Sequence, residues 1–125
     1  MATEFQVKLP DRPGSLAKLG MALGDAKVNL RSIGGQKGQV GLVVSDRDTA
    51  KTRRALKKAG YRAKERSGVE MRLDDRPGSL ARAAARFGKK GVNIASAYVL
   101  APGRGKVAVA FIVKDARAAK RALGR

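Results

Sequence analysis

Alternating apolar and polar residues occur in two stretches of this chain that lie 64 positions apart. The first stretch runs from Phe5 to Leu9 and the second from Val69 to Leu73. Side chains alternate between the two faces of a strand, so each stretch predicts a β-strand whose apolar residues share one face. The pattern therefore indicates a chain built from two similar halves.

An amphipathic helix is predicted after each of these strands. Residues 15–26 and 79–87 carry apolar side chains at spacings of three and four, which places those side chains on one helical face. We expect the buried stripes to consist of Leu16, Leu19 and Leu23 in the first helix, and of Leu80, Ala83, Ala84 and Phe87 in the second. One face of each helix then packs on the core.

The remaining pattern gives the first half a βαββαβ order. We expect strands at 28–33, 39–45 and 61–65, a hairpin loop at 34–38, and a second helix at 50–59 that follows a turn at 46–49 and ends at Gly60. The second half repeats this order with a strand that begins at 92–94, a longer hairpin loop at 101–105, a strand at 106–114 and a helix at 116–123. No last strand is predicted there.

The predicted fold class is α+β, with two ferredoxin-like βαββαβ repeats packed on each other and the second lacking its last strand. The repeats correspond to domains at 1–66 and 67–125, with Ser67-Gly68 as a short linker. A half of about 60 residues buries little apolar surface by itself, so we expect the halves to pack together. The sheet edge left open in the second half must be covered, and a strand from the first half or from another chain could do so.

Both halves contain the same seven residues between strand and helix, Asp-Arg-Pro-Gly-Ser-Leu-Ala, at 11–17 and 75–81. Proline fixes its own φ and biases the residue before it towards extended backbone, while glycine permits a sharp bend. The bend places Gly14 and Gly78 at helix N-termini, where free N–H groups and the helix dipole favour a carboxylate. The alternative to ligand binding is a purely structural role, because such a bend is needed to connect a strand to a helix whatever the protein's function.

This combination resembles the ACT domain family, and the resemblance covers essentially the whole chain. It is carried by the bends and by Val-Asn-Leu at 28–30 and Val-Asn-Ile at 92–94, each beginning 14 residues after the glycine of its bend. The resemblance implies a tandem ACT-domain protein that binds an amino acid or similar small carboxylate as a regulatory sensor. In that family the effector is usually held between two paired domains, by the bend of one and a strand of the other.

The chemistry of the bend and the resemblance together give the expected ligand-binding residues. Asp11 and Asp75 could accept hydrogen bonds from an ammonium, and by resemblance Asn29 and Asn93 line the site from the neighbouring strand. The full expected set is Asp11, Arg12, Gly14, Ser15, Leu16, Asn29 and Leu30 in the first half, and Asp75, Arg76, Gly78, Ser79, Leu80, Asn93 and Ile94 in the second.

The sequence contains neither cysteine nor histidine. Disulfide frameworks, thiolate metal sites and catalysis by a near-neutral imidazole are therefore excluded. Asp74-Asp75 superficially suggests a carboxylate pair, but adjacent side chains at a strand end point apart. We expect no enzyme activity, no cofactor and no metal. The N-terminus resembles no targeting peptide and no apolar run is long enough to span a membrane, so we expect a cytoplasmic protein.

A net charge of +18 raises nucleic-acid binding as an alternative function. Residues 1–66 hold 15 basic and 6 acidic side chains and residues 67–125 hold 13 and 4, so the charge is spread evenly. Lys51, Arg54 and Lys58 share a helix face that could contact phosphates, although a solvated surface is the more frequent fate of such a face. RRM-like base stacking is disfavoured, because the third strand of the first half has no aromatic residue.

A third alternative is pure assembly. The chain would then be a ligand-free scaffold or a regulatory subunit that docks on an enzyme. Sheet edges and helix faces in this fold lend themselves to side-by-side pairing, so we expect a homodimer.

Overall fold

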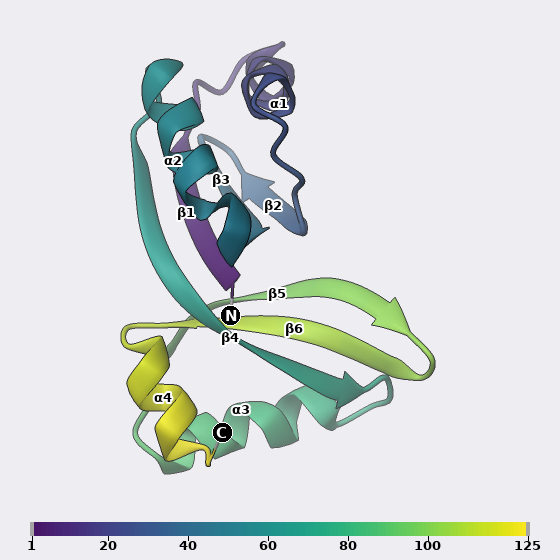
Figure 1. The fold of residues 1–125 in the computed structure, drawn as a ribbon. Helices are drawn as coiled ribbons and strands as arrows, with labels where there is room; N and C mark the ends of the chain where they lie inside the picture. The colour runs from purple at the N-terminus through teal and green to yellow at the C-terminus, as the bar shows by residue number, and fades with distance from the viewer. Residues whose placement is uncertain (1, 125) are drawn as a thin grey trace. The chain divides into compact units, whose positions relative to one another are not determined.

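The computed structural model describes residues 2–124. Its strands are β1 (Ala2–Lys8), β2 (Ser32–Gln36), β3 (Gln39–Ser45), β4 (Ala63–Asp74), β5 (Ile94–Gly103) and β6 (Lys106–Val113). Its helices are α1 (Ser15–Asp25), α2 (Thr49–Lys58), α3 (Ser79–Lys89) and α4 (Ala116–Ala122), with a 3₁₀ turn η1 (Asp46–Asp48) before α2. This order confirms the predicted α+β class, and no strand follows α4 within the described residues (Figure 1).

The chain divides into two compact units. The first unit is Thr3–Glu65, in which the hydrogen-bonded neighbours follow the order β2-β3-β1-β4. The second unit comprises residues 66–124 together with Ala2, and its order is β4-β6-β5. Pairing is antiparallel between β2 and β3, between β4 and β6, and between β5 and β6. Each unit is therefore a sheet with two helices.

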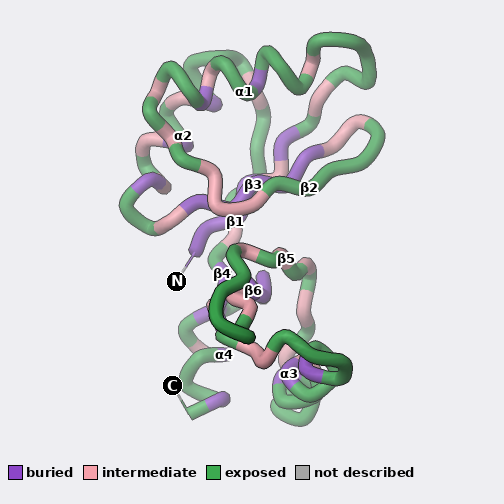
Figure 2. Tube along the Cα trace, turned by 90° about the vertical axis from the view of Figure 1, so that its right-hand side faces the viewer, coloured by how far each residue is buried: buried purple, intermediate pink, exposed green. Residues whose placement is uncertain are grey.

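The core of the first unit lies between its helices and one face of its sheet. Its buried members are Phe5, Val7, Leu19, Leu23, Val40, Leu42, Val44 and Leu56. They come from alternate positions of β1 and β3 and from single faces of α1 and α2, as the two periodicities require. The face predicted for the first alternating stretch is thus confirmed, and Figure 2 shows buried segments, in purple, where β1 and β3 lie.

The core of the second unit is arranged in the same way around two phenylalanines. The ring of Phe87 in α3 lies 5.1 Å from the ring of Phe111 in β6, centroid to centroid, and both side chains are fully buried. Val69 and Met71 of β4 join them in one cluster. Strand β6 lies between β4 and β5, and its consecutive residues Val109 to Val113 are all buried, which confirms the central strand predicted from its apolar run.

Strand β4 corrects the sequence interpretation, which placed two separate strands on either side of a Ser67-Gly68 linker. The structure has one continuous strand of 12 residues, Ala63–Asp74. Gly68 is buried within it, and a Cβ at this position would lie only 2.7 Å from Cδ1 of Ile112 and 3.6 Å from the carbonyl oxygen of Ala2. Glycine is thus present because neighbouring atoms approach closely, and not because the chain bends.

Both hairpins are tighter than the sequence suggested. Strand β2 covers Ser32–Gln36 instead of 28–33, and Gly34 and Gly35 pair with β3, so the turn is only Lys37-Gly38. In the second unit β5 begins at Ile94, and its hairpin turn is Arg104-Gly105 instead of 101–105. Glycine and proline indicated loops at these places, but ladder hydrogen bonds to β3 and β6 hold these segments as strand.

Two leucines that we expected in the buried helix stripes are exposed. Leu16 is 56% exposed and Leu80 is 59% exposed, whereas Leu19, Leu23, Ala83 and Phe87 are buried as expected. Both exposed leucines lie in the first turn of their helix, directly after the bend. Position in the first turn, next to the bend, therefore overrides the helical periodicity.

Membrane insertion through helices finds no support in the part of the chain that the structure describes. No helix there combines the length and apolar character needed to cross a bilayer.

Candidate functional site

The first bend leaves backbone donors free at the start of α1. Gly14 adopts φ of 87°, a left-handed conformation that favours glycine. The N–H of Ser15 donates to the carbonyl of Arg12 (3.2 Å), and the first helical bond runs from the N–H of Lys18 to the carbonyl of Gly14 (3.0 Å). Within residues 2–124 the N–H groups of Leu16 and Ala17 meet no acceptor, and no side chain caps the helix.

A cavity of about 460 Å³ opens between this bend and the β2–β3 hairpin; we call it the hairpin cavity. The bend contributes Asp11, Arg12, Ser15 and Leu16 to its lining, all of which belong to the predicted site. The opposite wall is the hairpin at 33–40. The structure therefore brings four of the seven site residues predicted in the first half to one cavity.

Contacts between bend and hairpin fix the shape of the hairpin cavity. The N–H of Leu9 donates to the carbonyl of Gly38 (3.1 Å), and Nζ of Lys37 lies 3.7 Å from the carboxylate of Asp11. Leu16 and Ile33 both line the cavity and are 56% and 48% exposed. The cavity thus combines a carboxylate, cations and two accessible apolar side chains.

Asn29 and Leu30 do not line the hairpin cavity. Instead of opening a strand, as the sequence suggested, they lie in the connection between α1 and β2. The N–H of Asn29 donates to Oδ2 of Asp48 (3.4 Å), and Nζ of Lys51 donates to the carbonyl of Lys27 (2.7 Å). These bonds hold the connection beside the start of α2. The side chain of Asn29 is exposed there.

Asp48 lies in the turn expected at 46–49, at the N-cap position of α2, but its side chain binds another segment. Its side chain makes no capping hydrogen bond to α2 and the residue is only 6% exposed. Burial raises the pKa of its carboxyl, but the Asn29 N–H and the Lys51 ammonium 3.3 Å away outweigh that effect, so the pKa is lowered overall. Asp48 is therefore a buried anchor for the α1–β2 connection.

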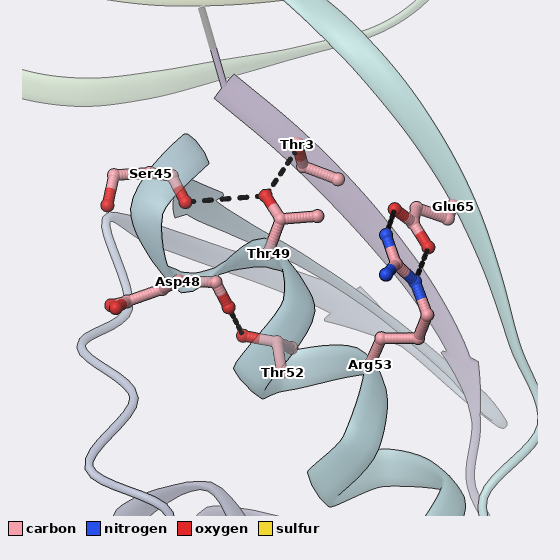
Figure 3. A network of polar contacts seen from close by, with 7 residues as sticks. All are labelled: Thr3, Ser45, Asp48, Thr49, Thr52, Arg53 and Glu65. Atoms are coloured by element: carbon pink, nitrogen blue, oxygen red, sulfur yellow. Dashed lines mark hydrogen bonds and ion pairs between the residues drawn. The ribbon is translucent and has the colours of Figure 1, made fainter.

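Further polar contacts hold α2 to its unit (Figure 3). Thr52 donates through its hydroxyl to the carbonyl of Asp48 (2.7 Å), and the hydroxyls of Thr3 and Thr49 lie 2.9 Å apart. Arg53 makes two hydrogen bonds to the carboxylate of Glu65, with Nε 2.8 Å away, and this contact lowers the pKa of Glu65. Two of the basic side chains of α2, Arg53 and Lys51, are thus engaged within the protein.

The second bend has the same backbone and a different environment. Gly78 has φ of 88°, but Nη1 of Arg82 lies 2.9 Å from where its Cβ would be, and Nη2 of Arg82 donates to the hydroxyl of Ser79 (3.1 Å). A cavity of about 200 Å³ lies nearby, lined by Ser79 and Arg82 among others. Asp75, Arg76, Gly78 and Leu80 are not part of its lining.

Asp74 dominates the electrostatics of the second bend. Its carboxylate pairs with Lys106, which also hydrogen-bonds to it, and with Arg76 at 3.2 Å. The hydrogen bond from Lys106 is the main reason that the pKa of Asp74 is lowered; burial opposes it, while Arg76 and Arg82 add to it. The remaining predicted residues, Asn93 and Ile94, lie at the start of β5, where Asn93 is exposed and Ile94 packs against the core.

Sequence reasoning missed the hairpin wall at 33–40, because the glycines at 34, 35 and 38 suggested a loop. It also missed the difference between the bends: Asp74 stands where the first repeat has Pro10, and this exchange is visible in an alignment of the two halves. No group of three or more acidic side chains within residues 2–124 is placed to hold a metal ion.

Residues 67–125 match the family profile of the ACT domain. No curated protein matches the chain significantly.

Three solved structures share the fold over almost the whole chain. A Bacteroides thetaiotaomicron protein has a TM-score of 0.77 and 21% identity, covering 98% of this chain and 85% of that one. The ligand-free regulatory subunit of aspartate kinase from Thermus thermophilus has a TM-score of 0.68 and 22% identity, covering 98% and 89%. The corresponding subunit from Thermus flavus has a TM-score of 0.67 and 20% identity, covering 98% and 90%.

Proposed function

We propose that this protein is a cytoplasmic, non-catalytic regulator that binds an amino acid in the hairpin cavity and transmits its presence to a partner enzyme. The observation that supports this most is the convergence of Asp11, Arg12, Ser15 and Leu16 on one cavity of about 460 Å³. That volume lies within the range of small-molecule sites, roughly 300–1,000 Å³. The ACT match at 67–125 and the likeness to aspartate kinase regulatory subunits agree with this role.

Each part of an amino acid has a complementary group at this cavity. The free N–H group of Leu16, at the positive end of α1, suits the carboxylate. Asp11 can accept hydrogen bonds from the ammonium, in competition with Lys37. Leu16 and Ile33 offer apolar surface to the ligand's side chain. The second bend, with its smaller cavity, is a weaker candidate for the same chemistry.

We further propose a homodimer in which the exposed amide of Asn29 or Asn93 reaches the ligand from the paired domain. Neither side chain is buried, so each is free to face a partner. Nucleic-acid binding through α2 is the less favoured alternative, because Lys51 and Arg53 are already engaged with Asp48 and Glu65.

A thermal-shift screen of the full chain against the common amino acids tests the proposal directly. A ligand that prefers the native state raises the melting temperature by mass action. We expect one amino acid to do so, with the shift strongly reduced in Asp11→Asn and unchanged in Asp25→Asn, which removes an exposed carboxylate from the other end of α1. If no amino acid shifts the transition, or if both variants respond alike, the hairpin cavity is not the sensor site.

The proposed contact from the asparagines of the paired domain is tested by Asn29→Ala and Asn93→Ala, with affinity measured by calorimetry. Both side chains are exposed, so stability should change by less than about 0.5 kcal/mol while binding weakens. Should both variants bind as tightly as the parent protein, the asparagines do not contact the ligand.

A further inference from the structure

A second cavity of about 530 Å³ lies on the first unit, and all the charged side chains that line it are positive; we call it the basic cavity. It is lined by Lys8, Pro10, Arg12, Pro13, Gly14, Ser15, Lys18, Ala59, Gly60, Tyr61 and Arg62. Four of these residues are cations and none is a carboxylate. It shares the bend with the hairpin cavity, but its other wall is the connection between α2 and β4.

The four cations come from four separate places in the sequence that the fold brings together. Lys8 ends β1, Arg12 lies in the bend, Lys18 lies one turn into α1, and Arg62 precedes β4. Within residues 2–124, none of the four has an ion-pair or side-chain hydrogen-bond partner. Four like charges around one cavity repel one another, and an anion in the cavity would relieve that repulsion.

The backbone beside Arg62 is held in place, so the wall of the basic cavity is preformed. Gly60 ends α2 with φ of 85°, and the N–H of Tyr61 donates to the carbonyl of Leu56 (2.9 Å). The side chain of Tyr61 packs partly against the core and also lines the cavity. An aromatic surface therefore adjoins the cations, and it suits the organic part of a ligand.

The corresponding cavity of the second repeat also contains a carboxylate and a hydroxyl. Arg72 and Arg82 stand 64 positions after Lys8 and Lys18 and line the smaller cavity of that repeat. That cavity also contains Asp74, which pairs with Lys106 and Arg76, and Ser79, which accepts from Arg82. In the first repeat, Pro10 replaces this carboxylate, and the cations face an open cavity.

We propose that the basic cavity binds a small molecule that carries phosphate groups. Phosphate brings more charge per group than a carboxylate, and its oxygens accept hydrogen bonds from several donors, including the planar guanidinium of arginine. The cations converge on a single cavity and do not form a stripe, which favours a compact polyanion over a nucleic-acid strand. The proposal does not rest on amino-acid sensing, because the hairpin wall plays no part in it.

Calorimetry and thermal shift on the full chain, with inorganic pyrophosphate as the probe, test this proposal. We expect pyrophosphate to raise the melting temperature and ATP to do so at lower concentration, since Tyr61 lies beside the cations. The double variant Lys18→Gln/Arg62→Gln should weaken pyrophosphate binding about a hundredfold, from about tenfold for each lost charge-assisted hydrogen bond.

A matched double variant, Arg54→Gln/Lys57→Gln, removes the same charge from exposed positions of α2 outside the cavity. It should change pyrophosphate affinity less than about twofold at fixed salt. Circular dichroism verifies that both variants fold, which is expected because Lys18 and Arg62 are exposed. In NMR spectra, pyrophosphate should shift the amide signals of Gly14 and Gly60.

Four outcomes would overturn the proposal. The first is the absence of any response to pyrophosphate, and the second is equal weakening of pyrophosphate binding in the two double variants. The third is that citrate binds as tightly as pyrophosphate, which would show a general polyanion effect. The fourth is tight binding of a single-stranded oligonucleotide without binding of pyrophosphate. None of these depends on whether an amino acid binds in the hairpin cavity.

Discussion

The two bends of this protein have identical sequences and nearly identical backbones, yet they have different surroundings. Gly14 and Gly78 have φ of 87° and 88°, and each precedes a helix of 11 residues. The first bend adjoins cavities of about 460 and 530 Å³, whereas the cavity at the second has about 200 Å³. A shared local sequence therefore sets the path of the chain without setting the chemistry beside it.

The difference arises from a few side chains outside the shared seven residues. The carboxylate of Asp74 forms ion pairs with Lys106 and Arg76. The guanidinium of Arg82 lies beside Gly78 and donates a hydrogen bond to the hydroxyl of Ser79. At the first bend, Pro10 offers no charge, and nothing lies within 4 Å of where the Cβ of Gly14 would be. The side chains beside the second bend are thus paired with one another, while the cations beside the first bend face open cavities.

The largest expected effect comes from removing the equivalent core side chains of the two units, Phe87 and Leu23. Phe87 is fully buried against Phe111, and Leu23 is 2% exposed. Phe87→Ala should lower the free energy of unfolding by about 3–5 kcal/mol and Leu23→Ala by about 2–5 kcal/mol. Urea denaturation followed by circular dichroism measures both losses. A loss below about 1 kcal/mol for Phe87→Ala would contradict the core assigned to the second unit.

Valine at the bend glycines should have a smaller effect on stability and should separate the roles of the bends. A left-handed backbone costs a residue with a side chain about 1–2 kcal/mol, so Gly14→Val and Gly78→Val should destabilise similarly. The Cβ added at Gly78 meets only the flexible end of Arg82. Each change should weaken binding at its own bend, because it disturbs the backbone of the residues that follow the glycine. Loss of the amino-acid response in Gly78→Val alone would move the site to the second bend.

The smallest effect on stability is expected at Asp74 and should depend on pH. Its pKa is lowered from 3.8 in the folded protein, chiefly by the hydrogen bond from Lys106. Its contribution is therefore fully present above the unfolded value and is lost as the pH falls through the lower folded value. Asp74→Asn should reduce the melting temperature at pH 7, and the difference from the parent protein should vanish in strong acid.

The neighbouring variant Asp75→Asn is the control for this experiment. Asp75 is exposed and makes no ion pair within residues 2–124, so the same change in charge should leave the melting temperature almost unaltered. Equal losses in the two variants, or a loss in Asp74→Asn that persists in acid, would show that the Asp74 ion pairs do not stabilise the second bend.

Much of the fold could be predicted because its determinants are local. The alternation at 5–9 and 69–73, the helical spacing of Leu19 and Leu23, and the apolar run of β6 each reflect which face of an element is buried. The predictions of secondary structure were wrong where contacts with residues distant in the sequence determine the conformation. Gly68 suggested a linker, but it pairs with Ile112 of β6 within a continuous strand.

The candidate site likewise has a part that could be predicted from the sequence and a part that could not. The residues of the bend could be named from the sequence, because proline and glycine restrict the backbone directly. The opposite wall at 33–40 and the anchoring of Asn29 to Asp48 could not be predicted, since both depend on which segments pack side by side.

By itself, the sequence determined the order of strands and helices, the two bends and the strong positive charge, because periodicity and backbone restriction act over a few residues. Only the tertiary structure decided which of the two identical bends borders large cavities. Hydrogen bonds and charge pairs such as Asp74 with Lys106 join residues that are 32 positions apart, and no local pattern specifies them.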